Sequence, residues 1–410
     1  MTLIGRDGAP LEVQLPKSSA RQYYRPELDV VRFLAFLFVF LSHTLPRTPT
    51  PRASAFLGRF APLFYAVANA GRFGVCLFFT LSAFLICELL LREREVSGTV
   101  AVKQFYIRRI LRIWPLYYFG LALGAVLACL PGGSRDELVG LCWFAIFLGA
   151  WRSATHGWLN NPMFVLWSVS IEEQFYLFAP WVVKCFRRRV LYIFAAAIVL
   201  GANAWLYRLC MENASDDRIW ADSLVQFQCF AAGIFLCLIL RGRAPQVGLW
   251  MRSLLLAGSG LCWLIACGGP DSAYAIAYDT SARWIILSKV FLISAGSILM
   301  LLAFLGLSWR LLPRWAVYLG RISFGLYVFH GVARDLSFYI FPKTADFHGS
   351  MFILRFCTAL GLTVAMAAIS YRYIESPFLK LKKRHTIIES QPLLEHLAGI
   401  GAAPEVVSRT

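Results

Sequence analysis

Ionisable side chains interrupt an apolar stretch near the start of the chain, where a plain membrane anchor would carry none. Arg32 and His43 lie within the run from Arg25 to His43, eleven residues apart. On an α-helix that spacing is three turns plus about 20°, so both side chains share one face, about 16 Å apart along the axis. A near-neutral imidazole can take a proton from an attacking hydroxyl, which makes His43 a candidate general base. Ionisable residues inside a membrane span indicate a functional site.

Two adjacent carboxylates, Glu172 and Glu173, lie near the middle of a second apolar stretch. Neighbouring helix residues point about 100° apart, so the two cannot face the same partner. One of them could orient the His43 imidazole and stabilise its protonated form, as the carboxylate of a catalytic triad does. The alternative is a structural ion pair with Arg32 or another buried cation. Periodicity does not choose between the two, and both are predicted as catalytic candidates.

Three arginines, Arg108, Arg109 and Arg112, lie at the start of a third apolar stretch. A guanidinium group binds phosphate through two parallel hydrogen bonds, so the cluster suits a phosphate-rich ligand. The excess of basic residues in the cytoplasmic loops of membrane proteins explains the same cluster without any ligand. Both interpretations remain open.

A last group of polar and aromatic residues is predicted to line a substrate channel. Tyr327 and His330 are three residues apart on a predicted helix and therefore share a face. A structural hydrogen bond between helices would explain them equally well. Trp167 and Ser168 begin the helix that carries the carboxylate pair. Ser168 lacks the G-x-S-x-G elbow of a nucleophilic serine, so we expect a channel or packing role for it.

The composition indicates a polytopic helical membrane protein that would hold these residues within the bilayer. The chain has 410 residues, of which 59% are hydrophobic and 15% charged, with a mean hydropathy of +0.62. A soluble domain is nearer half apolar. The formal charge of +17 does not indicate a nucleic-acid partner, because the basic residues cluster in loops expected to face the cytoplasm. We expect membrane lipids to surround the protein.

The predicted fold is an all-α bundle of about ten spanning helices with both termini in the cytoplasm. Basic clusters at 92–112 and 184–189 mark cytoplasmic ends. The apolar segment 138–151 is shorter than the ~20 residues needed to cross, so it is predicted to be re-entrant or interfacial. The segment 315–341 is predicted as one span. A loop over 47–71 carries arginines on the outer side and is the one exception to the charge bias.

Three parts are predicted along the chain: a cytoplasmic tail over 1–24, a transmembrane domain over 25–378 and a basic cytoplasmic tail over 379–410. We expect no cleavable signal peptide, because the first apolar run continues into charged sequence. The 11 cysteines sit mostly in apolar runs without the spacing of a zinc site, so no metal site is predicted.

Six stretches stand out along the chain: R-P-E-L-D-V-V-R…H (25–43), G-V-C-L-F-F-T-L-S-A-F-L-I (74–86), F-Y-I-R-R-I-L-R-I-W-P (105–115), W-S-V-S-I-E-E-Q-F-Y-L (167–177), L-G-R-I-S-F-G-L-Y-V-F-H (319–330) and Y-R-Y-I-E-S-P-F (371–378). Together they resemble motifs of the acyltransferase-3 family of integral membrane O-acyltransferases. Each motif alone is a weak signal, and six in the family's order are a strong one. Cys76 stands where the family usually has Asp, and Ala83 where it usually has Gly, so we look for specificity at these two positions. Some members carry an extracytoplasmic esterase-like domain, which we do not expect in this chain.

The resemblance implies transfer of an acyl group, most simply acetyl, from cytoplasmic acyl-CoA to a hydroxyl of a carbohydrate, glycolipid or glycoside. It implies that His43 is the catalytic base or carries the acyl group, and that Arg109 and Arg112 bind the donor. We add Arg32 and Arg108 to this predicted donor site. Acyl-CoA is then a substrate, no cofactor is bound permanently, and the location is the bacterial inner membrane. The alternative is a transporter or flippase of a glycolipid or anionic substrate, although we find no internal repeat.

Overall fold

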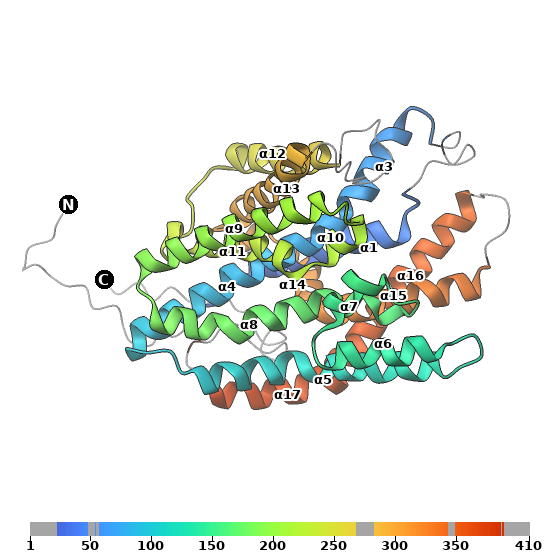
Figure 1. Ribbon diagram of the computed structural model, residues 1–410, viewed down its shortest axis with the longest axis horizontal. Coiled ribbons are helices and arrows are strands. Elements are labelled where there is room, and N and C mark those ends of the chain that lie inside the picture. Colours follow the sequence, from blue (N-terminus) through green and yellow to red (C-terminus); the bar gives the residue numbers. More distant parts are fainter. Residues whose placement is uncertain are drawn as a thin grey trace, which may run out of the picture.

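The computed structural model describes residues 23–47, 54, 57–267, 283–342, 349–386 and 388. Across these residues the chain is helical and contains no β-strand (Figure 1). The predicted all-α class is therefore confirmed for the described part. Most of the two predicted tails, residues 1–22 and 389–410, lies outside it.

The α-helices of the described residues follow one another closely along the chain. They are α1 (Pro26–Thr44), α3 (Ala61–Ala70), α4 (Gly74–Ser97), α5 (Val102–Ala128), α6 (Arg135–Ala145), α7 (Gly149–His156), α8 (Trp167–Cys185), α9 (Arg188–Met211), α10 (Asp216–Ala221), α11 (Ser223–Leu240), α12 (Leu249–Ala266), α13 (Arg283–Phe304), α14 (Arg314–Arg321), α15 (Ser323–Ile340), α16 (Gly349–Ser370) and α17 (Ser376–Lys382).

The helices identify a multi-pass integral membrane protein. Seven helical segments of the described part are long and apolar enough to cross a bilayer, or eight if the bent pair α14 and α15 forms one span. Two further helices, α1 and α8, have 19 residues each. Their charged residues are Glu27, Asp29 and Arg32 in α1, and Glu172, Glu173 and Lys184 in α8. The total of about ten spans and the cytoplasmic position of both termini stay predictions.

The structure corrects the predicted loop over 47–71. Its second half is α3, and a short 3₁₀ turn, Gly71–Phe73, joins α3 directly to α4. Pro62 is compatible with this helix because it lies in the first turn, where a proline needs no N–H partner. The segment 138–151 falls on α6 and α7, which have 11 and 8 residues and are each too short to cross a bilayer.

The last helices also differ from simple uninterrupted spans. The segment 315–341 is not one helix: α14 and α15 meet at a bend of 77°. The break allows α14 to lie against the backbone of α1, where a Cβ added to Gly320 would come within 1.8 Å of the Asp29 carbonyl oxygen. At the other end, a π-helical turn, Tyr371–Glu375, carries α16 on into α17. The helical structure therefore continues past residue 378. The division of the chain into a transmembrane domain and a basic tail stays a prediction.

Helix α4 is the central element around which the candidate site residues are arranged. It packs against α1, α8, α11 and α13, and it runs between α8 and α11 (Figure 1). The contact with α11 is closest at Gly233, where an added Cβ would lie 2.2 Å from the Thr80 carbonyl oxygen and 2.9 Å from Ala83 Cβ. A small residue is therefore required at this position for the two helix backbones to approach.

Gly233→Ala is expected to destabilise the protein and lower its melting temperature in detergent. The new methyl group has no room against the α4 backbone, and overpacking of this kind costs about 1–3 kcal/mol. Gly201→Ala is the matched control, because a Cβ at Gly201 in α9 meets no atom within 4 Å. The control should melt at or above the wild-type temperature, since alanine favours a helix by about 1 kcal/mol over glycine. Equal melting of both variants would contradict the close packing.

Candidate active site

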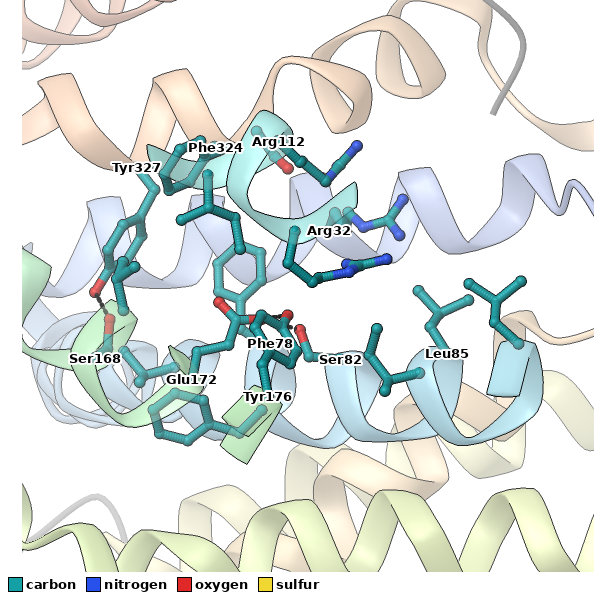
Figure 2. A pocket seen from close by; sticks show the side chains of 18 of the residues that line it. Arg32, Phe78, Ser82, Leu85, Arg112, Ser168, Glu172, Tyr176, Phe324 and Tyr327 are labelled. Carbon is teal, nitrogen blue, oxygen red and sulfur yellow. Dashed lines mark hydrogen bonds between the residues drawn. The ribbon is translucent and has the colours of Figure 1, made fainter. Parts of the chain in front are cut away.

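A cavity of about 130 Å³ lies among α1, α4, α5, α8, α15 and α17. Figure 2 shows Arg32 and Arg112 near each other on one side of it. On the other side, the hydroxyl groups of Ser168 and Tyr327 are hydrogen-bonded at 2.6 Å. The cavity is basic at one end and carries hydroxyl groups at the other. Six of the predicted site residues line it: Arg32, Arg109, Arg112, Ser168, Glu172 and Tyr327.

The basic end holds arginines from two helices. Arg109 and Arg112 are three residues apart on α5 and share a face. The guanidinium of Arg109 lies 5.4 Å from the centre of the Tyr176 ring, and its Nε has no hydrogen-bond partner among the described residues. Arg32 forms an ion pair with Asp29, one turn earlier on α1. Guanidinium groups that line a cavity in this way suit the oxygens of a phosphate.

Lys382 adds a fourth cation that the sequence analysis missed. The sequence predicts it within the basic cytoplasmic tail over 379–410. Because the π-helical turn extends the last helix, Lys382 reaches the cavity lining beside Arg109 and Arg112. The same turn brings the buried Glu375 into electrostatic interaction with Arg112.

Arg108 does not line this cavity. Its guanidinium forms an ion pair with Glu93 at 2.7 Å, and it donates a hydrogen bond of 2.9 Å to the carbonyl of His385. Both partners of the ion pair are buried. This contact joins α4 to α5, so the structure places Arg108 in the scaffold that supports the basic end.

The two carboxylates point to different partners, as their spacing predicts. Glu172 lines the cavity and accepts hydrogen bonds from the hydroxyls of Ser82 and Tyr176 (Figure 2). Glu173 accepts a hydrogen bond of 3.2 Å from Trp114 Nε1. The predicted contact of either carboxylate with His43 is not among the hydrogen bonds of the described residues, because these partners hold both carboxylates toward α4 and α5.

The partner of His43 is His330, which the sequence analysis placed only in a channel. Nδ1 of His43 lies 2.9 Å from Nε2 of His330, and Nδ1 of His330 lies 2.6 Å from the Tyr327 carbonyl oxygen. His330 is fully buried, whereas His43 is partly exposed. We refer to these two residues as the histidine pair.

The hydrogen bonds of the histidine pair assign its protons. A carbonyl oxygen can only accept, so Nδ1 of His330 carries the hydrogen and Nε2 of the neutral ring is an acceptor. Nδ1 of His43 then donates to it, which leaves the lone pair of His43 on Nε2. This is the tautomer that a general base or a nucleophilic imidazole requires, with the second nitrogen held by an acceptor.

Tyr327 connects the cavity to the histidine pair. Its hydroxyl bonds to Ser168 at the end of the cavity, and its ring lies 5.5 Å from that of His330. Trp167 does not line the cavity. Its buried ring packs 5.6 Å from Trp158, so its role is to support the start of α8.

Cys76 and Ala83, where we looked for specificity, lie on a different face of α4. Cys76 Sγ is 3.8 Å from Gln226 Oε1 on α11, and Ala83 packs at the close contact with Gly233. Both are buried and neither lines the cavity. Their small side chains permit the approach of α11, and the expectation that they select the substrate is not supported.

Comparison with known proteins finds a family and several individual proteins that are similar to this chain. The model of a family described as an acyltransferase domain matches residues 25–372. The chain is 24% identical over 384 residues to a Staphylococcus aureus protein named as an O-acetyltransferase, covering 87% of this chain and 58% of that protein. It is also 24% identical over 382 residues to the peptidoglycan O-acetyltransferase of Listeria monocytogenes, covering 87% and 56%.

A third relative comes from an animal and not from a bacterium. The regulator of hypoxia-inducible factor 1 of Caenorhabditis elegans is 30% identical over 165 residues, which cover 37% of this chain and 33% of that protein. The chain spans less than two thirds of the length of these curated relatives. No solved structure matches it.

Proposed function

Because this chain belongs to the acyltransferase domain family, we propose that it is an integral membrane O-acetyltransferase that moves an acetyl group from acetyl-CoA to a hydroxyl of a cell-envelope carbohydrate. One observation carries the proposal: the cavity has four cations at one end, and Tyr327 at its other end lies next to the histidine pair, in which Nε2 of His43 carries a lone pair. The names of the bacterial relatives support an acetyl group, a glycan acceptor such as peptidoglycan, and a bacterial membrane.

The donor enters with its phosphates on the basic end of the cavity. Arg109 and Arg112 bind the phosphate oxygens, and Arg32 and Lys382 add positive charge. The flexible arm of the coenzyme extends toward Tyr327 along the apolar part of the lining, which includes Phe78 on α4 (Figure 2). The thioester then lies at the end of the cavity that adjoins the histidine pair.

The transfer step uses Nε2 of His43. This nitrogen takes the proton of the acceptor hydroxyl while the oxygen attacks the thioester carbonyl. The C–S bond breaks, and the proton passes from His43 to the departing sulfur, so the products are an O-acetyl ester and free coenzyme A. His330 keeps Nδ1 of His43 engaged throughout, in the place where a triad has its carboxylate.

The alternative covalent route uses the same nitrogen. Nε2 would attack the thioester, carry the acetyl group and then release it to the acceptor hydroxyl. A rapid-quench experiment separates the routes, because an acetyl-imidazole intermediate requires release of one equivalent of coenzyme A before any acceptor is added. In either route Glu172 holds Ser82 and Tyr176 in place on the cavity wall.

The decisive experiment measures transfer by the purified full chain in lipid nanodiscs. With radiolabelled acetyl-CoA and peptidoglycan fragments or other envelope glycans, we expect label on the glycan and one free coenzyme A for each ester formed. A transporter or flippase would move its substrate across proteoliposomes without consuming acetyl-CoA. Absence of both coenzyme A release and acceptor labelling across the glycan panel would reject the proposed function.

A further inference from the structure

Three arginines surround the histidine pair at the end of α1 opposite Arg32. Arg47 follows His43 by four residues, just beyond the end of α1. Arg334 follows His330 by four residues on α15, which places it one helical turn further along the same face. The third is Arg72, and we call Arg47, Arg72 and Arg334 the distal arginine cluster.

Close backbone packing places Arg72 beside the other two arginines. A Cβ added to the preceding Gly71 would lie 2.4 Å from the Phe38 carbonyl oxygen and 3.1 Å from Ser42 Cβ, so this turn contacts the last turns of α1. The side chain of Asn69 donates a hydrogen bond of 3.1 Å to the carbonyl of Arg47. The cluster therefore draws one member each from the end of α1, the Gly71–Phe73 turn and α15.

The distal arginine cluster is an electrostatic unit. All three arginines interact electrostatically with His43, and Arg47 interacts with both of the others. Two carboxylates oppose them: Asp335, paired with Arg334 at 2.7 Å, and Asp217, which interacts with Arg47. Arg72 instead stacks on the ring of Trp220, 4.2 Å from its centre. Three cations against two carboxylates leave this region positive, although like charges held together repel one another.

Aromatic rings continue the surface beside His43. The ring of Phe164 meets His43 edge-on at 5.6 Å, and Trp158 lies 6.0 Å from Phe164. Phe164 and Trp158 are both partly exposed, as are Arg72 and Arg334. Flat apolar faces next to fixed cations can hold a sugar ring by its C–H face and an attached anion by its charge.

We propose that the distal arginine cluster binds the acceptor, and that the acceptor is a carbohydrate bearing a carboxylate or a phosphate group close to the hydroxyl that is acetylated. The inference rests on the proposed function. In the proposed function, the phosphates of the donor bind the four cations at the basic end of the cavity. Arg32, one of these four, lies about 16 Å from His43 along the axis of α1. A second cationic cluster on the other side of His43 therefore serves a second anion.

The test measures binding to the full chain in nanodiscs at low salt by isothermal titration. Three probes distinguish the source of the charge: a tetrasaccharide of alternating N-acetylglucosamine and glucuronic acid, its neutral methyl ester, and N-acetylglucosamine 6-phosphate. We expect at least one charged probe to bind tenfold or more tightly than the neutral ester, and we expect the difference to shrink at high salt. Whichever charged probe binds identifies a carboxylate or a phosphate acceptor.

Substitution then locates the site. Arg72→Gln and Arg334→Gln should each abolish the preference for the charged probe, while Arg72→Lys should retain part of it. Arg208→Gln is the control, because Arg208 is 65% exposed on α9 and pairs with Glu212. Equal binding of charged and neutral probes, or binding of none, would overturn the proposal.

The two proposals can fail separately. Anion binding that depends on the distal arginine cluster, in a protein that never consumes acetyl-CoA, would reject the proposed function alone. Conversely, an acetyl-transfer rate that depends neither on the charge of the acceptor nor on the substitution of Arg72 or Arg334 would reject only the distal site.

Discussion

Replacement of His43 by alanine is expected to lower kcat for acetyl transfer about 10³-fold, with KM for acetyl-CoA unchanged within about twofold. A positioned general base contributes about 10²–10⁴-fold to a proton transfer. The Nε2 of His330 loses its donor in this variant, but His330 is fully buried and does not take the place of the His43 ring. The donor keeps its affinity because the cations of the cavity are untouched. Steady-state kinetics with labelled acetyl-CoA and a saturating glycan measure both quantities.

Variants of His330 test whether the pair sets the tautomer. His330→Leu removes the acceptor for Nδ1 of His43 and should lower kcat by a measurable factor of about 10² relative to wild type. His330→Gln offers a carbonyl oxygen near the position of Nε2 and should recover part of the loss. His156→Ala is the control, because His156 is exposed at the end of α7. Full activity of His43→Ala would remove the proposed base.

The double substitution of Arg109 and Arg112 by glutamine is expected to raise KM for acetyl-CoA by about 10²-fold or more, with a smaller effect on kcat. Each charge-assisted hydrogen bond contributes about 1.5–3 kcal/mol, so even one lost contact to phosphate costs about tenfold in affinity. Donor binding can also be measured without any acceptor, by titration of coenzyme A into the full chain in nanodiscs.

A donor without phosphates provides the matched control for this prediction. S-acetyl-pantetheine carries the thioester and the flexible arm only, so wild type and the double variant should use it equally poorly. Arg108→Gln should behave differently from both, because it breaks a buried ion pair with Glu93 and costs about 3–5 kcal/mol of stability. The phosphate site is wrong if the double variant binds coenzyme A as tightly as wild type does.

Local helix geometry explains what could be predicted from the sequence. Arg32 and His43 are on one helix, and their common face follows from the spacing alone. The grouping of Arg109 and Arg112 on α5, and of Tyr327 and His330 on α15, follows in the same way. The structure adds that the arginines line the cavity, whereas the histidine pair lies outside its lining, next to Tyr327.

Contacts between distant segments could not be predicted in this way. His43 and His330 are 287 residues apart, and no periodicity relates them. Glu172 and Glu173 on α8 are hydrogen-bonded to Ser82 and Trp114, which belong to other helices. The position of the two carboxylates within their own helix therefore does not predict which partner each one contacts. Lys382 was missed because a basic run at the end of a span is the ordinary mark of a cytoplasmic boundary.

Tyr327 lines the cavity and its ring contacts that of His330, while its hydroxyl is held by Ser168 at 2.6 Å and by the Val165 carbonyl at 2.9 Å. Movement of a group past this ring, from the cavity to the histidine pair, therefore requires the ring to turn and both hydrogen bonds to break, at about 0.5–1.5 kcal/mol each. The helices can stay in place while it happens. In the proposed reaction the small acetyl group passes the turned ring, whereas the nucleotide of the coenzyme and the sugar of the acceptor each stay on their own side of it. The proposed enzyme would thus exchange a group between two substrates whose bulky parts never meet.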